Sequence, residues 1–210
     1  MAKQVIPGAG LWSTIVALIN GNYDELYYKA GTGWIDILGN LSDSASLPGT
    51  PGWVQLIDDG AGSTGIYGRG FDDTIEESLL VNFHIPHGIS STTIFPHIHW
   101  APLSTGTGVV RWGIEYSYSR GYSQEAFGNS SFEYIEQAGA GTINTHQVAE
   151  NGTGITIANL EPDGILTCRL FRDAGHANDT YTGDAVALFM DIHAQVDRIT
   201  TPNRNYPFDS

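Results

Sequence analysis

Three runs of alternating side chains between residues 79 and 118 constrain this fold more than any other feature of the sequence. In residues 79–85, 94–100 and 109–118, bulky apolar side chains recur at every second position. A period of two places successive side chains on opposite faces of an extended strand. Each run therefore predicts a strand with one apolar face and one mixed or polar face. Proline and glycine stand between the runs, where they favour turns.

Further runs extend this pattern towards the C-terminus. Residues 125–138, 142–149 and 152–160 are weaker strand candidates, whereas 165–172 is a clear one and 185–198 is the most regular in the chain. In that last run, one face is predicted to carry Val186, Leu188, Met190, Ile192, Ala194 and Val196.

Roughly eight short strands, with almost no helix after residue 30, predict a mainly β fold. We expect an antiparallel, jelly-roll-like sandwich with an N-terminal helical or extended arm. The pattern alone also leaves an immunoglobulin-like sandwich open, although the Cys–Trp–Cys spacing of that domain is absent.

The N-terminal part differs from the rest, and we divide the chain into an arm at 1–70 and a β-sandwich domain at 71–210. Apolar residues near the N-terminus recur at helical spacing and form a single stripe. The stripe comprises Ile15, Leu18, Ile19, Tyr23 and Leu26. Such a stripe needs a partner surface, either on the main domain or on another subunit. Residues 31–70 are rich in Gly and Asp and are expected to be extended, with short strands at 34–38 and 53–57.

Composition excludes several partner classes. The chain has 23 acidic and 9 basic residues, for a net charge of −14. Such a chain repels phosphate backbones and anionic lipid, so we expect neither a nucleic-acid partner nor a membrane. Neither a membrane-spanning helix nor a signal peptide is expected, since no long apolar run or basic-then-apolar N-terminus occurs. The one cysteine, Cys168, stands in an apolar run and is interpreted as a core residue.

Histidines dominate the predicted polar faces. His97 and His99 stand two apart and so share a strand face, while His84 and His193 lie on the polar faces of their own strands. Glu115 and Asp191 lie on polar faces too. If these strands are neighbours, the side chains converge on a divalent-metal ligand set that is similar to that of the cupins.

A metal-dependent, cupin-like enzyme is therefore one hypothesis. The spacing departs from the usual cupin motif, because no Glu follows the H-x-H pair until Glu115. The favoured interpretation is that the histidines pair across strands or at a subunit interface, with no metal or other cofactor. No nucleotide-binding or nucleophile motif occurs, so no catalytic residue is predicted.

Several segments resemble structural proteins of tailed-bacteriophage virions. The sequence INGNYDELY at 19–27 is similar to a segment frequent near the N-termini of phage tail and head accessory proteins. The stronger likeness lies in FHIPH at 83–87, FPHIHW at 95–100, GVVRWGIEYS at 108–117 and DIHAQVDRITTPNRNYPF at 191–208.

The resemblance implies a virion component without an enzymatic role. It favours a jelly-roll capsid cement or decoration protein that binds the major capsid protein as a homotrimer on the capsid exterior. A tail, head-fibre or receptor-binding component is the alternative. The expected interface residues are Ile15, Ile19, Tyr23 and Leu26 of the arm, and His97, His99 and His193 of the sandwich.

Overall fold

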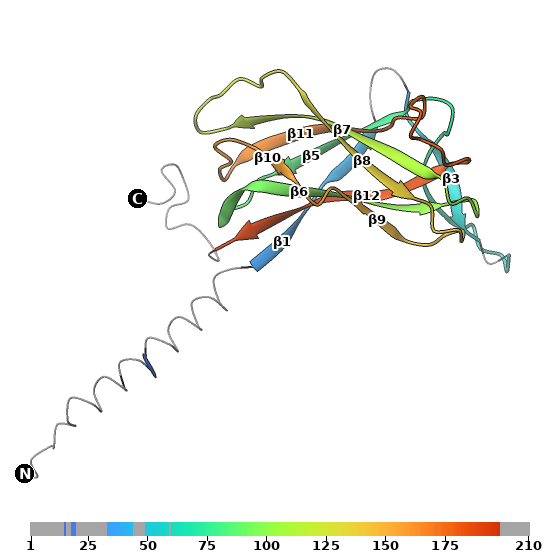
Figure 1. Ribbon diagram of the computed structural model, residues 1–210, viewed down its shortest axis with the longest axis horizontal. Coiled ribbons are helices and arrows are strands. Elements are labelled where there is room, and N and C mark those ends of the chain that lie inside the picture. Colours follow the sequence, from blue (N-terminus) through green and yellow to red (C-terminus); the bar gives the residue numbers. More distant parts are fainter. Residues whose placement is uncertain (1–14, 16–17, 20–32, 44–48, 59, 198–210) are drawn as a thin grey trace, which may run out of the picture.

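The computed structural model describes residues 15, 18–19, 33–43, 49–58 and 60–197. More than half of the described residues lie in the strands of two antiparallel sheets packed face to face (Figure 1). The first, which we call the β6–β12 sheet, contains β1 (Gly33–Leu38), β3 (Gly52–Ile57), β4 (Ile66–Phe71), β6 (Ile89–Pro102), β9 (Gln147–Glu150), β10 (Ile155–Thr156) and β12 (Ala185–Val196). The second, the β7–β11 sheet, contains β2 (Asn40–Asp43), β5 (Ser78–His84), β7 (Val109–Arg120), β8 (Ser131–Ala138) and β11 (Gly164–Arg172).

The strand order is that of a jelly roll. Strands β4, β12, β6 and β9 are neighbours in that order in one sheet, and β5, β11, β7 and β8 in the other. The chain therefore crosses repeatedly between the two sheets, as the eight strands of a jelly roll do. This confirms the predicted fold class and decides against the immunoglobulin-like alternative.

The core lies between the sheets and is built from the predicted apolar faces. From the three central runs it takes Leu79, Val81, Phe83, Ile85, Ile94, Ile98, Trp100, Val110, Trp112 and Ile114, all of them fully buried. From the clear strand β11 it takes Leu166, Cys168 and Leu170. Burial of Cys168 raises its thiol pKa to about 12, in agreement with its interpretation as a core residue.

The face assignment was wrong in the first part of β12. The pairing of β12 with β6 shifts register between Ala187 and Phe189, which makes a β-bulge at Leu188. A bulge adds one residue to a strand and so reverses its alternation. Before the bulge the core receives Ala185 and Ala187, and after it Met190, Ile192 and Ala194. Leu188 itself lies at the margin of a cleft between the sheets.

Four strands lie between residues 33 and 71. The predicted short strands are β1 and β3, while β2 and β4 were not predicted. Between β1 and β2 the chain passes from one sheet to the other at Gly39, where an added Cβ would lie 2.4 Å from Val81 and 2.5 Å from Phe83. The arm boundary at residue 70 stays a prediction, but the passage before it pairs with sandwich strands β12 and β5.

Other predicted segments are shorter than expected or lie outside the described residues. The candidates at 125–138, 142–149 and 152–160 contain β8, β9 and the two-residue β10, because glycine-rich loops occupy the remainder. In the predicted helical stripe, Ile15, Leu18 and Ile19 are helical, whereas Tyr23 and Leu26 lie outside the described residues. Among the described residues no helix is long and apolar enough to cross a membrane.

Candidate functional site

The histidine pair of β6 lies on the outer face of the β6–β12 sheet. His97 and His99 share this face because they are two residues apart. Strand β12 runs antiparallel beside β6, in a register that places Asp191 opposite His97. His193, two residues further along β12, lies on the same face. We call His97, His99, Asp191 and His193 the histidine cluster.

Three further titratable side chains adjoin the cluster. Glu150 of β9 lies opposite His97, and Asp36 of β1 lies opposite the histidine of β12. His146, in the loop before β9, places its Nε2 atom 2.8 Å from Nδ1 of His99. None of these three side chains could be predicted from the alternation pattern, because that pattern shows the face on which a residue lies but not its neighbour on another strand.

The carboxylate of Asp191 lies at the centre of the cluster. Its Oδ1 atom is 3.2 Å from Nε2 of His99 and 3.8 Å from Nδ1 of His97. Its Oδ2 atom is 4.0 Å from Nε2 of His193. The rings of His97 and His193 pack edge-on, with centroids 3.7 Å apart. Three imidazoles around one carboxylate can share a proton or accept a cation.

The centre of the cluster is shielded from solvent. The side chains of Asp191, His97 and His99 are 4%, 5% and 14% exposed. Burial lowers the pKa of His99, and this effect outweighs the opposing attraction of Asp191 for the imidazolium. Within the described part of the chain, Nε2 of His97, Nε2 of His99 and Oδ1 of Asp191 are buried without a hydrogen-bond partner. Buried polar atoms are normally paired, so these three atoms mark the cluster as the candidate site.

Two predicted members do not join the cluster. His84 lies on β5, in the other sheet, where its Nε2 atom is 3.0 Å from Oδ1 of Asp163. Glu115 lies on β7 of that same sheet and pairs with Arg169 at 2.8 Å. Both are on polar faces, as predicted, but those faces belong to the opposite side of the sandwich. The carboxylates near the histidines are those of Asp191, Glu150 and Asp36 instead.

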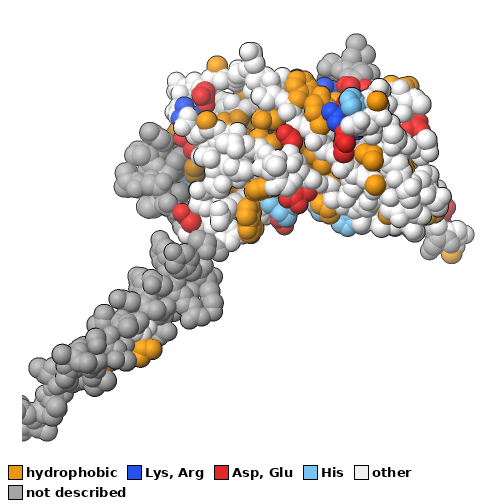
Figure 2. Space-filling view, in the orientation of Figure 1, with side chains coloured by type: hydrophobic (Ala, Val, Ile, Leu, Met, Phe, Trp, Pro, Cys, Tyr) orange, Lys and Arg blue, Asp and Glu red, His pale blue; other side chains and the backbone are white. Residues whose placement is uncertain are grey.

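An apolar rim surrounds the histidine cluster. Exposed side chains on the same outer face are Trp34 (58% exposed), Leu38 (70%), Val148 and Phe189. The ring of Phe189 stacks on that of His99 at 4.0 Å. Figure 2 shows histidine side chains beside acidic and hydrophobic ones along the lower edge of the body. We call Trp34, Leu38, Val148 and Phe189 the apolar rim.

A cavity of about 410 Å³ adjoins the rim and the cluster. It is lined by Trp34, Phe95, Glu150 and His193. The rings of Trp34 and Phe95 meet edge-on, with centroids 5.5 Å apart. The cluster thus lies beside an aromatic hollow rather than on a flat polar surface.

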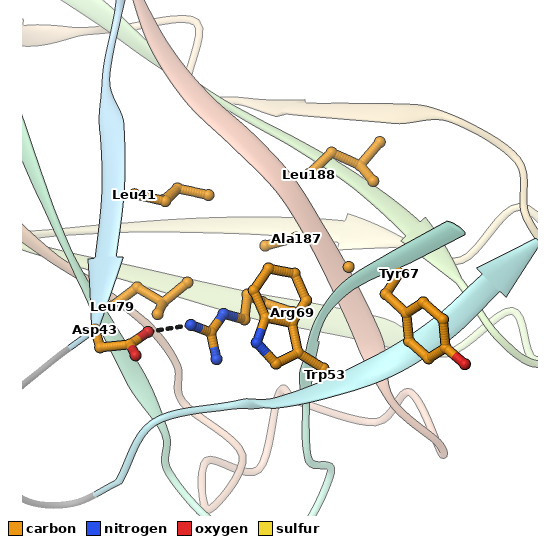
Figure 3. Close-up of a pocket in the computed structure, with 9 residues that line it drawn as sticks. Leu41, Asp43, Trp53, Tyr67, Arg69, Leu79, Ala187 and Leu188 are labelled. Atoms are coloured by element: carbon orange, nitrogen blue, oxygen red, sulfur yellow. Dashed lines mark hydrogen bonds and ion pairs between the residues drawn. The ribbon is translucent and has the colours of Figure 1, made fainter. Parts of the chain in front are cut away.

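A second hollow lies between the two sheets, at the edge formed by β2, β3 and β4 (Figure 3). Its volume is about 360 Å³, and its lining includes the exposed rings of Trp53 and Tyr67. The guanidinium of Arg69 lies 4.1 Å from the centre of the Trp53 ring and forms an ion pair with Asp43. An exposed aromatic ring over a charged pair suits a ligand with both apolar faces and hydroxyl groups.

Comparisons with known proteins give structural neighbours only. No family model matches the sequence, and no curated protein does. The fold is similar to a family 35 carbohydrate-binding module from an environmental isolate, with 14% identity and a TM-score of 0.39 over 73% of this chain and 91% of that chain. A second family 35 module, Xyl-CBM35 in complex with a glucuronic-acid-containing disaccharide, has 10% identity and a TM-score of 0.37 over 76% and 91% of the chains.

A third neighbour is TmCBM61 in complex with β-1,4-galactotriose. It has 15% identity and a TM-score of 0.31, over 64% of this chain and 73% of that chain. At such identities and TM-scores, none of these likenesses says what this chain binds.

Proposed function

We propose that this chain is a structural protein of a tailed-bacteriophage virion, of the capsid cement or decoration type. The observation that carries the proposal is the apolar rim around a buried polar cluster on one sheet face. Trp34, Leu38, Val148 and Phe189 expose large apolar surfaces there. Large apolar side chains exposed on one face are typical of surfaces that contact other proteins. The resemblance of the sequence to virion proteins is the reason for proposing that these contacts are made in a phage capsid.

The mechanism in this proposal is adhesion without catalysis. The chain forms a homotrimer in which His97, His99 and His193 lie at the axis or at the seam between protomers. The arm docks on the major capsid protein, and the trimer bridges adjacent capsomers. Ile19 of the arm is helical and 58% exposed, which leaves an apolar side chain available for docking. A net charge of −14 disfavours the DNA-filled interior and so supports a location on the capsid exterior.

The trimer is tested by native mass spectrometry of the purified protein. We expect a trimer for the wild type and a monomer for the double variant Trp34→Ser/Leu38→Ser, because the latter removes two exposed apolar contacts. The matched control is Phe127→Ser/Phe132→Ser, which removes two exposed aromatic rings outside the rim and should stay trimeric. A wild-type monomer at all concentrations would refute the assembly.

Shell binding is tested by cosedimentation with phage capsids that lack this protein. We expect the wild type to sediment with the shells, and a chain without residues 1–30 to remain in solution with its sandwich intact. If the truncated chain binds as well as the wild type, the arm has no role in docking. If neither chain binds, the capsid proposal fails.

The second hollow favours one alternative, a fibre or receptor-binding component. Its exposed aromatic rings, Trp53 and Tyr67, are the kind of side chain on which sugars stack. In that case the protein should bind host-surface glycans on an array, and Trp53→Ala should abolish the signal. Capsid binding without glycan binding would exclude this alternative.

A further inference from the structure

We propose that His97, His99 and Asp191 bind one divalent transition-metal ion, such as Zn²⁺, on the outer face of the β6–β12 sheet. This site does not depend on the proposed virion function, because it is formed by residues of a single chain. Its ligand atoms would be Nδ1 of His97, Nε2 of His99 and Oδ1 of Asp191.

The spacing of the three side chains suits one ion. Each offers a ligand atom within 4.8 Å of the other two. Zinc bonds of about 2.0–2.1 Å at tetrahedral angles place ligand atoms roughly 3.3 Å apart. Oδ1 of Asp191 lies 3.2 Å from Nε2 of His99 and 3.8 Å from Nδ1 of His97. Small side-chain rotations would complete the site without moving the backbone.

The unpaired atoms supply a second, independent argument. Nε2 of His99 and Oδ1 of Asp191 are buried and close together, yet among the described residues neither has a hydrogen-bond partner. Their contact of 3.2 Å lacks hydrogen-bond geometry. A cation between them would satisfy both atoms, which otherwise incur a desolvation cost.

The surroundings hold the ligands as metal sites require. Nδ1 of His99 forms a 2.8 Å hydrogen bond with Nε2 of His146. Nε2 of His97 has no hydrogen bond among the described residues but lies within ion-pair distance, 3.2 Å, of a carboxylate oxygen of Glu150. Partners on the far nitrogen of a ligating histidine fix its ring orientation and tautomer. Two imidazoles and one carboxylate are a ligand set for Zn²⁺ and other divalent first-row ions, with a further position left for water or another ligand.

A neighbouring group is a weaker candidate for the ion. Asp36, Asp191 and His193 also come within metal-ligand distance of one another. However, Nε2 of His193 already contacts Oδ1 of Asp36 at 2.7 Å, and both side chains are substantially exposed. Because that pair satisfies itself, we assign a single ion to His97, His99 and Asp191.

The test is calorimetric titration of the full chain with Zn²⁺ after chelator treatment and dialysis. We expect one Zn²⁺ per chain for the wild type, and binding at least 100-fold weaker for His99→Gln and for Asp191→Asn. The matched controls are His84→Gln and Asp163→Asn, which alter the His–Asp pair on the other sheet. Both should bind as the wild type does.

Two additional readouts separate loss of metal from loss of fold. Without metal, near-ultraviolet circular dichroism should be the same for all five proteins. With Zn²⁺, the melting temperature should rise for the wild type and both controls but not for His99→Gln or Asp191→Asn. If a site variant is misfolded, the visible absorption spectrum of Co²⁺ bound to the wild type still reports the geometry of the ligands. The spectrum of Co²⁺ bound to His84→Gln should then be the same as that of the wild type.

Either of two results would overturn the site. If the wild type binds no Zn²⁺, the unpaired atoms instead form a direct His99–Asp191 hydrogen bond in a metal-free protein. If His99→Gln and Asp191→Asn bind as the wild type does, the ion lies elsewhere. The outcome is distinguishable from that of the virion proposal, since metal binding by the isolated chain does not require trimers or shells.

Discussion

Replacing Arg172 with methionine is expected to destabilise the sandwich by about 3–5 kcal/mol, because it leaves a buried carboxylate without its cation. The side chains of Arg172 and Asp179 are 0% and 1% exposed, and Nη2 of the arginine lies 2.7 Å from Oδ1 of the aspartate. Breaking one side of such a pair costs more than the pair itself contributes, since the remaining charge cannot reach water.

The arginine also ties a loop to the sheets. Its guanidinium donates hydrogen bonds to the backbone carbonyls of Phe71, Tyr181 and Gly183. These contacts join the end of β4 to the loop that follows β11. The variant leaves those carbonyls without this donor, so we place the effect in the upper part of the stated range. For a chain of this length, it corresponds to a fall in melting temperature of roughly 6–20 °C.

The assay is urea unfolding followed by tryptophan fluorescence and circular dichroism, with the free energy of unfolding taken from the midpoint and slope. Arg120→Met is the matched control, because Arg120 pairs with Glu125 at the surface at a similar distance of 2.9 Å. Exposed pairs contribute little, so the control should unfold with the wild type. A free energy for Arg172→Met within 1 kcal/mol of the wild-type value would show that the buried pair does not hold the loop.

Three further predictions concern the core and a surface carboxylate. Cys168, whose burial raises its pKa to about 12, should resist iodoacetamide at pH 8 in the native protein and react once the protein is unfolded in urea; rapid native labelling would contradict its burial. Gly113→Ala should lower the free energy of unfolding by about 1–3 kcal/mol, since the added Cβ would lie 2.2 Å from the Phe171 ring. Gly128→Ala is the control, because the space around Gly128 is open. Equal urea midpoints for the two variants would show that Gly113 is not tightly packed against Phe171. Burial, followed by repulsion from two nearby aspartates, raises the pKa of Asp184, so its contribution to stability is largest below pH 3.8 and declines as the pH rises through the folded-state pKa. The stability of Asp184→Asn relative to the wild type should therefore increase with pH over that window. A difference in urea midpoints that does not change with pH would contradict this prediction.

Some features of the site could be predicted from the sequence because they are local. The spacing of His97 and His99 requires them to share a face of any strand that contains them. The same reasoning placed Asp191 and His193 together, and the bulge at Leu188 did not disturb them because both follow it. Upstream of the bulge, where one extra residue reversed the alternation, the prediction for Val186 failed.

The remainder of the site depends on which strands are neighbours. His84 and Glu115, like His97, occupy polar positions in alternating strands. They nevertheless lie on the opposite side of the sandwich, because β5 and β7 belong to the other sheet. Glu150 and Asp36 reach the cluster only through pairings of β9 with β6 and of β1 with β12.

The sequence by itself determined the longer strands, most of the buried face of each, the buried cysteine and the placement of two histidines on one surface, since all of these follow from a period of two along a single strand. Only the tertiary structure decided which carboxylates meet those histidines and which histidine is excluded. Those contacts join residues far apart in the chain, and their register is set by the jelly-roll path and by one bulge rather than by any local pattern.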